Sequence, residues 1–225
     1  MDGILLVDKP AGWTSHDAVA KVRSILKKET GRKVKVGHTG TLDPMATGLL
    51  VLVLGGCTKR AGEFSKLDKV YEAELTLGST SSTGDKEGEI IEVSNEQPEK
   101  LAVEAVLSRF EGEILQKPHK YSAVKIGGQR AYKAARAGKT VEIEPRKVKI
   151  YDITEVKYDY PNLKFTAKVS SGTYIRSLAE DIGAALGTGA YLSALRRTRV
   201  GDFNIADSLQ MSVLDYKSLL LHLAN

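Results

Sequence analysis

Two periodicities of hydrophobic and polar residues run along this chain of 225 residues, and each predicts one type of element. Residues 71–77 alternate between polar and apolar positions, which is typical of a half-buried strand. Residues 48–54 are almost all apolar and are followed by two glycines, so we expect a buried strand there. Thr14 and Asp17 stand at capping-box spacing before an apolar stripe of helical period, which predicts a helix closed by Gly31.

The same two periods, together with the turn residues between them, predict the strands and helices in the rest of the chain. Further strands are expected at 1–8, 34–37, 89–93, 141–143, 146–158 and 163–170, with short ones within 111–128. Further helices are expected at 98–110, 129–137, 174–186, 189–196 and 213–223. We expect strand 89–93 to pair with 71–77, and 146–158 to form a hairpin with 163–170. This pattern predicts an α+β fold, and since no linker divides the chain we expect a single domain over residues 1–225.

Composition narrows the class of protein. No stretch approaches the roughly 18 apolar residues that span a bilayer, and the apolar start of the chain has no basic leader. Cys57, the single cysteine, excludes an internal disulfide and is interpreted as a packed small residue. The four histidines do not stand at a metal-ligand spacing, and no phosphate-binding P-loop is present. We therefore expect a cytoplasmic protein without a metal, a nucleotide cofactor or a membrane partner.

The charges are segregated along the chain. Residues 1–60 carry a net charge of +5, residues 61–116 of −8, residues 117–149 of +8 and residues 150–225 of zero. The basic residues form three clusters: Lys27, Lys28, Arg32, Lys33 and Lys35; Lys117, Lys120, Lys125, Arg130, Lys133, Arg136 and Lys139; and Arg196, Arg197 and Arg199. Tyr121 and Tyr132 stand within the second cluster. Cations that pair with phosphates beside aromatic rings that stack on bases favour RNA as the partner, although a solvated helix face would also explain part of the second cluster.

The main candidate for chemistry is Asp43, in the string GHTGTLDPMATG at residues 37–48. Glycines and a proline bound this turn, and the buried strand follows it directly. A carboxylate held on a stiff loop at the mouth of a sheet is a common catalytic arrangement. An ordinary Asp-Pro turn is the alternative reading.

This string resembles the catalytic motif of the TruB family of tRNA pseudouridine synthases. Further segments resemble the family in the same order: 8–15 (DKPAGWTS), 69–71 (KVY), 83–88 (TGDKEG), 170–178 (SSGTYIRSL) and 191–197 (YLSALRR). A second acidic residue that is common at the segment 83–88 is replaced by Ser82 here. The resemblance extends from Gly3 to about Val200.

The resemblance implies a pseudouridine synthase fold, in which a long, mainly antiparallel mixed sheet is flanked by helices and has a central RNA-binding cleft. It implies isomerisation of uridine to pseudouridine at position 55 in the T-loop of tRNA, by base flipping and a catalytic aspartate, with no cofactor. The T-arm of tRNA would be the partner, and a monomer without an obligate protein partner is expected. Bacterial members usually carry a C-terminal PUA domain, which we do not expect in this chain.

The same resemblance implies roles for seven residues. Asp43 would be the catalytic carboxylate, and Arg176 would hold it ionised through a charge-assisted bond. Tyr71 would stack on the flipped uracil. The expected substrate-binding residues are His38, Tyr174, Leu195 and Lys9. From the pattern alone, Tyr71 and Leu195 are equally explained as core residues and His38 as a structural loop residue.

Three other functions remain open from the sequence. One is a non-catalytic RNA-binding or tRNA-folding protein on the same fold, although binding alone does not require Asp43, Tyr71 and Arg176 together. A second is the catalytic subunit of a guide-RNA complex. The third is a general hydrolase acting through Asp43, for which no second acid is evident.

Overall fold

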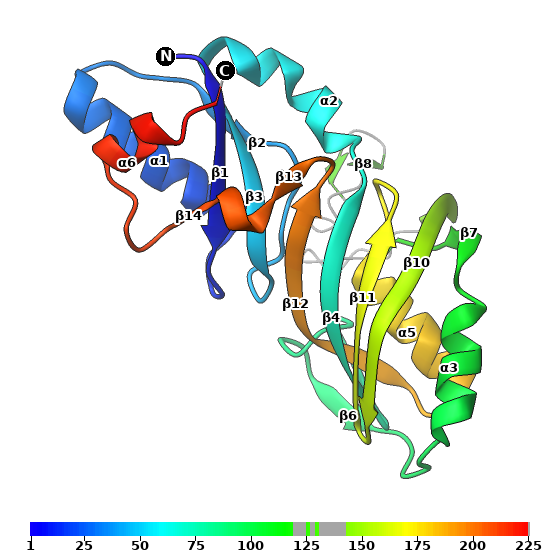
Figure 1. Ribbon diagram of the computed structural model, residues 1–225. Helices are drawn as coiled ribbons and strands as arrows, with labels where there is room; N and C mark the ends of the chain where they lie inside the picture. The colour runs from blue at the N-terminus through cyan, green and yellow to red at the C-terminus, as the bar shows by residue number, and fades with distance from the viewer. Residues whose placement is uncertain (119–124, 127–128, 131–142, 225) are drawn as a thin grey trace. The chain divides into compact units, whose positions relative to one another are not determined.

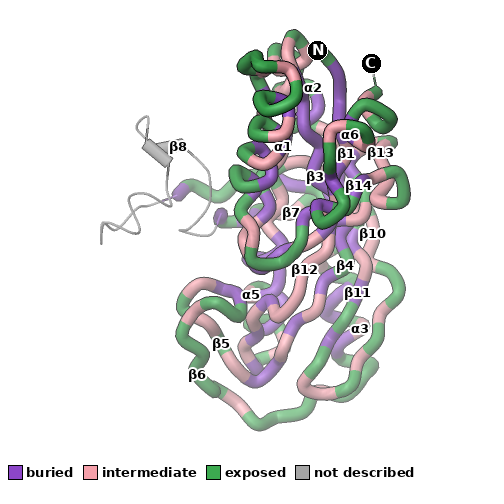
Figure 2. The backbone as a smooth tube through the Cα atoms, turned by 90° about the vertical axis from the view of Figure 1, so that its left-hand side faces the viewer, coloured by how far each residue is buried: buried purple, intermediate pink, exposed green. Residues whose placement is uncertain are grey.

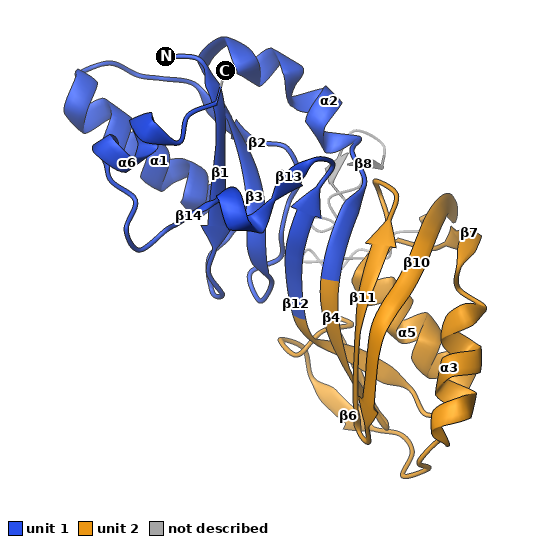
Figure 3. Cartoon of the chain, viewed as in Figure 1, with its two compact units in different colours: residues 1–71, 195–225 blue, residues 72–194 orange. Residues whose placement is uncertain are grey.

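The computed structural model describes residues 1–118, 125–126, 129–130 and 143–224. The fold is mixed α+β and contains a long, mostly antiparallel sheet, as predicted (Figure 1). The chain divides into two compact units (Figure 3). Unit 1 comprises Met1–Tyr71 and Leu195–Asn225, and unit 2 comprises Glu72–Ala194. Strands β4 (Lys69–Leu77) and β12 (Ala190–Val200) contribute residues to both units.

Unit 1 is built around a buried strand, β3 (Thr47–Leu54). The strand β1 (Gly3–Lys9) pairs with it antiparallel along its whole length, and β2 (Val36–His38) pairs with its second half. The end of β12 pairs parallel with the start of β3. The remaining elements of unit 1 are η1 (Gly55–Arg60), α2 (Ala61–Ser65), β13 (Phe203–Asn204), η2 (Ile205–Asp207), β14 (Leu209–Gln210) and α6 (Tyr216–Leu221).

Capping residues in the sequence set both ends of helix α1 (Ser15–Thr30). The predicted capping box is present, since Thr14 and Asp17 each bond the other's backbone N–H. Gly31 ends the helix in the left-handed conformation, with φ of 67°, and its N–H bonds the Lys27 carbonyl. Figure 2 shows buried residues along β1 and β3 and exposed residues on the outer side of α1.

Unit 2 has the strand order β4-β11-β10-β7. Its long hairpin, β10 (Arg146–Asp159) and β11 (Asn162–Val169), turns at Pro161 as predicted. Helices α3 (Lys100–Ser108) and α5 (Ile175–Leu186) pack against each other, and α3 also contacts β10. Figure 1 shows α5 behind the hairpin and α3 beside β10. The other elements are β5 (Ser79–Ser81), β6 (Ile90–Glu92), β7 (Gly112–Gln116), β8 (Lys125–Ile126) and β9 (Gln129–Arg130).

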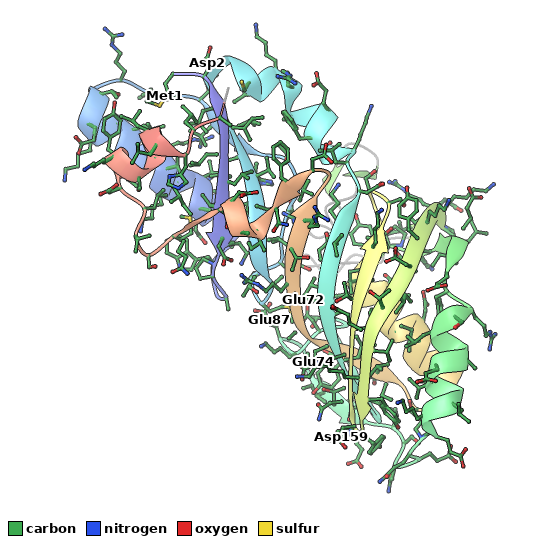
Figure 4. The ribbon with its side chains drawn as sticks, in the orientation of Figure 1. Met1, Asp2, Glu72, Glu74, Glu87 and Asp159 are labelled. Carbon is green, nitrogen blue, oxygen red and sulfur yellow. The ribbon has the colours of Figure 1, made fainter. Side chains whose placement is uncertain are left out.

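Glu72 and Glu74 project from the sheet of unit 2 on β4 (Figure 4). Glu74 forms an ion pair of 2.9 Å with Lys164 of β11, across neighbouring strands. Pairing of opposite charges on adjacent strands stabilises a solvated sheet face modestly, and it helps to fix which residues face solvent.

Two predicted helices and one predicted strand pairing are wrong. Residues 190–200 form β12, a strand, where a helix was expected at 189–196. Strand 90–92 pairs with β5 and not with 71–77, because the chain turns back within the intervening loop. Gln129 and Arg130 lie in β9, where a helix was expected to begin, and residues 131–137 lie outside the described residues. Among the described residues, no helix is long and apolar enough to cross a membrane.

Candidate active site

Asp43 lies on the loop that joins β2 to β3, where the sequence predicted it. The side chain is half-buried, so the carboxylate can meet a substrate while its surroundings are partly desolvated. The Asp43 carbonyl accepts a bond of 3.1 Å from the Ala46 N–H, which closes the turn through Pro44. The buried residues Leu42, Met45 and Ala46 anchor the loop on either side of Asp43.

Three buried polar side chains hold the backbone of this loop. Lys9 donates to the Pro44 carbonyl at 3.3 Å, Ser15 bonds both the N–H and the carbonyl of Leu42, and Arg197 donates to the Gly40 carbonyl at 3.0 Å. Lys9 and Ser15 belong to the string 8–15, and Arg197 belongs to β12. Because each donor is itself buried, the loop is held in one conformation before any substrate arrives.

The end of the loop that leads into β3 is fixed by close backbone packing. Gly48, at the start of β3, pairs with Arg197 of β12 and has φ of 104°. A Cβ atom built there would lie 2.3 Å from the Arg197 carbonyl oxygen. Only glycine combines this φ with this approach, which explains the last glycine of the GHTGTLDPMATG string.

Lys9 is wholly buried and its Nζ donates to the carbonyls of Pro10, Trp13 and Pro44, at 2.9, 2.6 and 3.3 Å. An ammonium that bonds three carbonyls satisfies its three donors with backbone. These contacts pack the string 8–15 against the Asp43 loop. The expected contact of Lys9 with substrate stays a prediction.

The other sequence-predicted residues of unit 1 lie on three strands. His38 is half-buried at the end of β2 and faces Leu52 of β3 in the register. Tyr71 is 8% exposed on β4, and Leu195 is half-buried on β12, where its carbonyl accepts from the Thr47 hydroxyl. Both residues therefore occupy strand positions compatible with a core role as well as a role at a pocket.

Unit 2 contributes a buried ion pair. The guanidinium of Arg176, which is 7% exposed in the first turn of α5, bonds the Asp85 carboxylate at 3.2 Å and the Thr83 carbonyl at 3.1 Å. Asp85 also accepts from the Thr83 hydroxyl at 2.6 Å and from the Glu87 N–H at 3.1 Å. An arginine beside the positive end of a helix needs an anionic partner, and Asp85 provides one.

Gln116 positions the segment that carries Tyr174. Its side chain donates to the Tyr174 carbonyl at 3.1 Å and accepts from the Tyr174 N–H at 2.8 Å. Gln116 is 1% exposed at the end of β7, and Tyr174 is the N-cap residue of α5. These two hydrogen bonds add to the bond of 3.1 Å that the Tyr174 carbonyl accepts from the Leu178 N–H, so the entry into α5 is fixed.

The predicted residues therefore divide between the two units. Lys9, His38, Asp43, Tyr71 and Leu195 belong to unit 1, whereas Tyr174 and Arg176 belong to unit 2. The proposed bond between Arg176 and Asp43 stays a prediction. Tyr121, Tyr132 and four basic residues of the second cluster, Lys120, Lys133, Arg136 and Lys139, lie outside the described residues.

Sequence reasoning assigned no role to Gln116, treated Ser15 only as part of the string 8–15, and left the role of Asp85 open. It placed Arg197 in the third basic cluster, among cations expected to favour RNA, whereas Arg197 is buried and bonds the carbonyls of Leu49 and Gly40. Asp85 lay in the string 83–88, which did not indicate Arg176 as its partner. Gln116 carried no recognisable signal, because a glutamine that binds backbone across 58 positions follows no local spacing.

A lysine next to this region has a perturbed pKa. Burial, together with the positive charge of Arg197, lowers the pKa of the Lys69 ammonium to about 8. Lys69 is 7% exposed and its Nζ bonds the carbonyls of Ser65 and Leu67. No group of three or more potential metal ligands occurs among the described residues.

Two family models match consecutive parts of the chain. Residues 23–175 match the TruB family pseudouridylate synthase (N terminal domain), and residues 176–221 match the tRNA pseudouridylate synthase B C-terminal domain. The chain belongs to the TruB family. The match to the N-terminal domain includes the Asp43 loop, Tyr71 and Tyr174. The boundary between the two matches lies at Arg176, in the first turn of α5.

Individual relatives agree with this TruB assignment. The chain is 46% identical to tRNA pseudouridine synthase B of Burkholderia lata over 95% of this chain and 65% of that protein. It is also 46% identical to tRNA pseudouridine synthase B of Thermobifida fusca, over 99% of this chain and 78% of that protein. This chain thus spans about two thirds of the length of the first of these relatives.

Solved structures show the same fold. A chain of a Cbf5-Nop10-Gar1 complex superimposes with a TM-score of 0.72 at 33% identity, covering 93% of this chain and 52% of that one. A chain of an H/ACA RNP bound to a substrate RNA containing 2'-deoxyuridine gives a TM-score of 0.69 at 30% identity, covering 93% and 51%. The pseudouridine synthase fold predicted from the sequence is confirmed.

Proposed function

We propose that this TruB chain isomerises uridine to pseudouridine in the T-loop of tRNA, at position 55. The observation that carries the proposal is the Asp43 loop, whose backbone is held by buried Lys9, Ser15 and Arg197 while the Asp43 side chain stays half-exposed. The relatives named tRNA pseudouridine synthase B support tRNA as the substrate. The likeness to a structure that holds a substrate RNA supports RNA as the ligand of the fold.

The reaction breaks the glycosidic bond between N1 of uracil and C1′ of ribose, and forms a bond between C5 and C1′. C5 loses a proton and N1 gains one, so no atoms are gained or lost overall. In the proposed mechanism the Asp43 carboxylate acts on the nucleotide as nucleophile or base. A rigid loop favours this chemistry because a carboxylate already in position loses little entropy when the substrate arrives.

The remaining residues would receive and orient the target nucleotide. Tyr71 would stack on the flipped uracil in place of its lost neighbours, and His38 would take the place of the base in the RNA. Tyr174 and Leu195 would line the pocket, and Lys9 would support the loop beneath the substrate. Arg176 would keep Asp43 ionised, while Asp85, which Arg176 contacts at 3.2 Å, would hold the guanidinium in place.

The experiment is tritium release from tRNA that carries tritium at uridine C5, with wild type, Asp43→Asn and Asp202→Asn compared. Asp202 is an exposed aspartate of unit 1 outside the candidate site, so it is a matched control for the same chemical change. We expect wild type and Asp202→Asn to release tritium from the T-loop uridine. Asp43→Asn should be slower by about a thousandfold or more, while still binding tRNA.

Appreciable release by Asp43→Asn would overturn the role of Asp43. Tight tRNA binding without release by the wild type would instead indicate a non-catalytic RNA-binding protein.

A further inference from the structure

Five basic side chains crowd the end of α1 and the loop that follows it. They are Lys27, Lys28, Arg32, Lys33 and Lys35, which we call the basic loop. All five are exposed, and Glu29 is the one acidic residue within residues 27–35. The basic loop therefore presents a net charge of +4 over nine residues to solvent.

No ion pair among the described residues neutralises this charge. The ion pairs in the described part of the chain all involve other cations. Asp2, beside Met1 at the start of the chain (Figure 4), instead accepts a bond of 2.8 Å from the Gly56 N–H. The partial negative charge at the end of α1 amounts to about half an elementary charge, which is far less than +4.

The backbone of the basic loop is well held. Gly31 bonds the Lys27 carbonyl at 3.0 Å, the Thr30 hydroxyl bonds the Leu26 carbonyl at 2.7 Å, and the Lys35 carbonyl accepts from the Gly55 N–H at 2.8 Å. The cations therefore extend from a fixed frame. Binding to such a frame orders side chains but not the loop itself, which lowers its entropic cost.

The basic loop lies far from the catalytic loop within the same unit. Helix α1 contains 16 residues, which corresponds to about 24 Å at roughly 1.5 Å per residue. Its first residue, Ser15, bonds Leu42 of the catalytic loop, and its last residue adjoins Gly31. A ligand of the basic loop is therefore a part of the substrate other than the target nucleotide.

We propose that the basic loop binds backbone phosphates of tRNA beyond the T-loop and so anchors the body of the tRNA. The inference rests on the proposed function, because that function supplies the RNA. A dense and exposed set of cations that forms no ion pair with the described residues fits a polyanion, and lysine and arginine bind phosphates without reading the sequence. Each neutralised phosphate adds salt dependence to the affinity.

The test compares two RNAs and three proteins. The RNAs are a complete tRNA transcript and a hairpin that contains the T-arm alone. The proteins are wild type, a basic-loop variant with Lys27→Gln, Lys33→Gln and Lys35→Gln, and a control variant with Lys66→Gln, Lys157→Gln and Lys217→Gln. The control loses the same charge from exposed lysines elsewhere in the chain. Dissociation constants are measured across a salt series.

We expect the basic-loop variant to bind the tRNA on the order of ten- to a hundredfold more weakly, with a salt slope smaller by about 2 to 3. The loss on the hairpin should be at least tenfold smaller, and Lys→Arg replacements at the same three positions should restore binding. The control should stay within about twofold of wild type. Equal losses on tRNA and hairpin, or equal losses for the two variants, would overturn the proposal.

Tritium release by wild type from the same two RNAs reports separately on the proposed reaction. A protein that binds tRNA through the basic loop but releases no tritium would overturn the reaction and leave the anchor supported.

Discussion

The ion pair between Arg176 and Asp85 is the most consequential side-chain contact outside the catalytic loop. Both side chains are almost fully buried, so each charge depends on the other for compensation. Removing one partner of such a pair leaves an uncompensated buried charge, which costs far more than the pair contributes when it is intact. Asp85 therefore ties the stability of unit 2 to the placement of Arg176.

We predict that Asp85→Ala lowers the free energy of unfolding by about 3 kcal/mol. The matched control is Glu63→Ala, which removes the partner of Arg60 in an exposed pair with 3.0 Å between the atoms. Because exposed pairs are screened by water, this control should change the free energy of unfolding by less than about 1 kcal/mol. Urea denaturation measures both, and similar effects of the two substitutions would contradict the assignment of the Asp85 pair as buried and essential.

The lowered pKa of Lys69 predicts how the free energy of unfolding depends on pH. Its pKa is about 8 in the folded state and 10.5 in the unfolded chain, so between these values the unfolded state binds more protons. The free energy of unfolding should therefore rise as pH increases from about 8 to 10.5, by on the order of 2–3 kcal/mol from this group. Lys69→Met removes this contribution. Denaturation curves at several pH values check it, and an unchanged pH dependence in the variant would rule Lys69 out as its source.

At the residue scale, the sequence predicted Asp43 and its loop because a long, unusual string surrounds them. It could not predict what holds the loop, since Lys9, Ser15 and Arg197 bond backbone carbonyls and N–H groups that any residue carries. The need of Arg176 for an anion was evident from its position at a helix start. Asp85 as a partner was not, because the two residues are 91 positions apart.

At the scale of elements, the helices with explicit end signals were predicted best. Helices α1 and α5 both end at glycines with positive φ, at Gly31 and Gly187, as the sequence indicated. The helix predicted at 189–196 was wrong because Leu192 and Leu195 stand at helical spacing and the neighbouring residues favour a helix. Strand β12 lies between β3 and β4 in the sheet, and these pairings override the local preference. Leu192 is fully buried, and its N–H and carbonyl bond the backbone of Gly84 and Lys86.

The contact between β3 and β12 gives a prediction of its own. Gly48→Ala would place a Cβ 2.3 Å from the Arg197 carbonyl oxygen, at a φ of 104°. The strands must separate, so we expect a loss of about 3 kcal/mol or more in the free energy of unfolding. Gly12→Ala is the matched control, because Gly12 has φ of 80° but nothing lies within 4 Å of its Cβ position.

Gly12→Ala should lower the free energy of unfolding only by the conformational strain of its positive φ, about 1–2 kcal/mol. Equal losses in thermal or urea unfolding would show that φ alone, and not the approach of β12, makes glycine necessary at position 48.

At the scale of the whole molecule, the sequence predicted the fold class and the family. The absence of a linker predicted a single domain over residues 1–225, which stays a prediction, and the structure shows two compact units that share the strands β4 and β12. Strand sharing leaves no flexible segment to detect in the sequence, because the boundary falls inside β4 and β12. The charge segregation remains visible at this scale, with the basic loop in unit 1 and the acidic residues 61–116 mostly in unit 2.

Unit 1 is also discontinuous in the chain, which affects the order of assembly on the ribosome. Unit 2 is one continuous segment, whereas β3 receives its parallel neighbour β12 only after residue 197 has been synthesised. At synthesis rates of roughly 5–20 residues per second, the apolar strand β3 waits several seconds or more with one edge paired only along its second half, by β2. We expect nascent chains to bind chaperones during that interval.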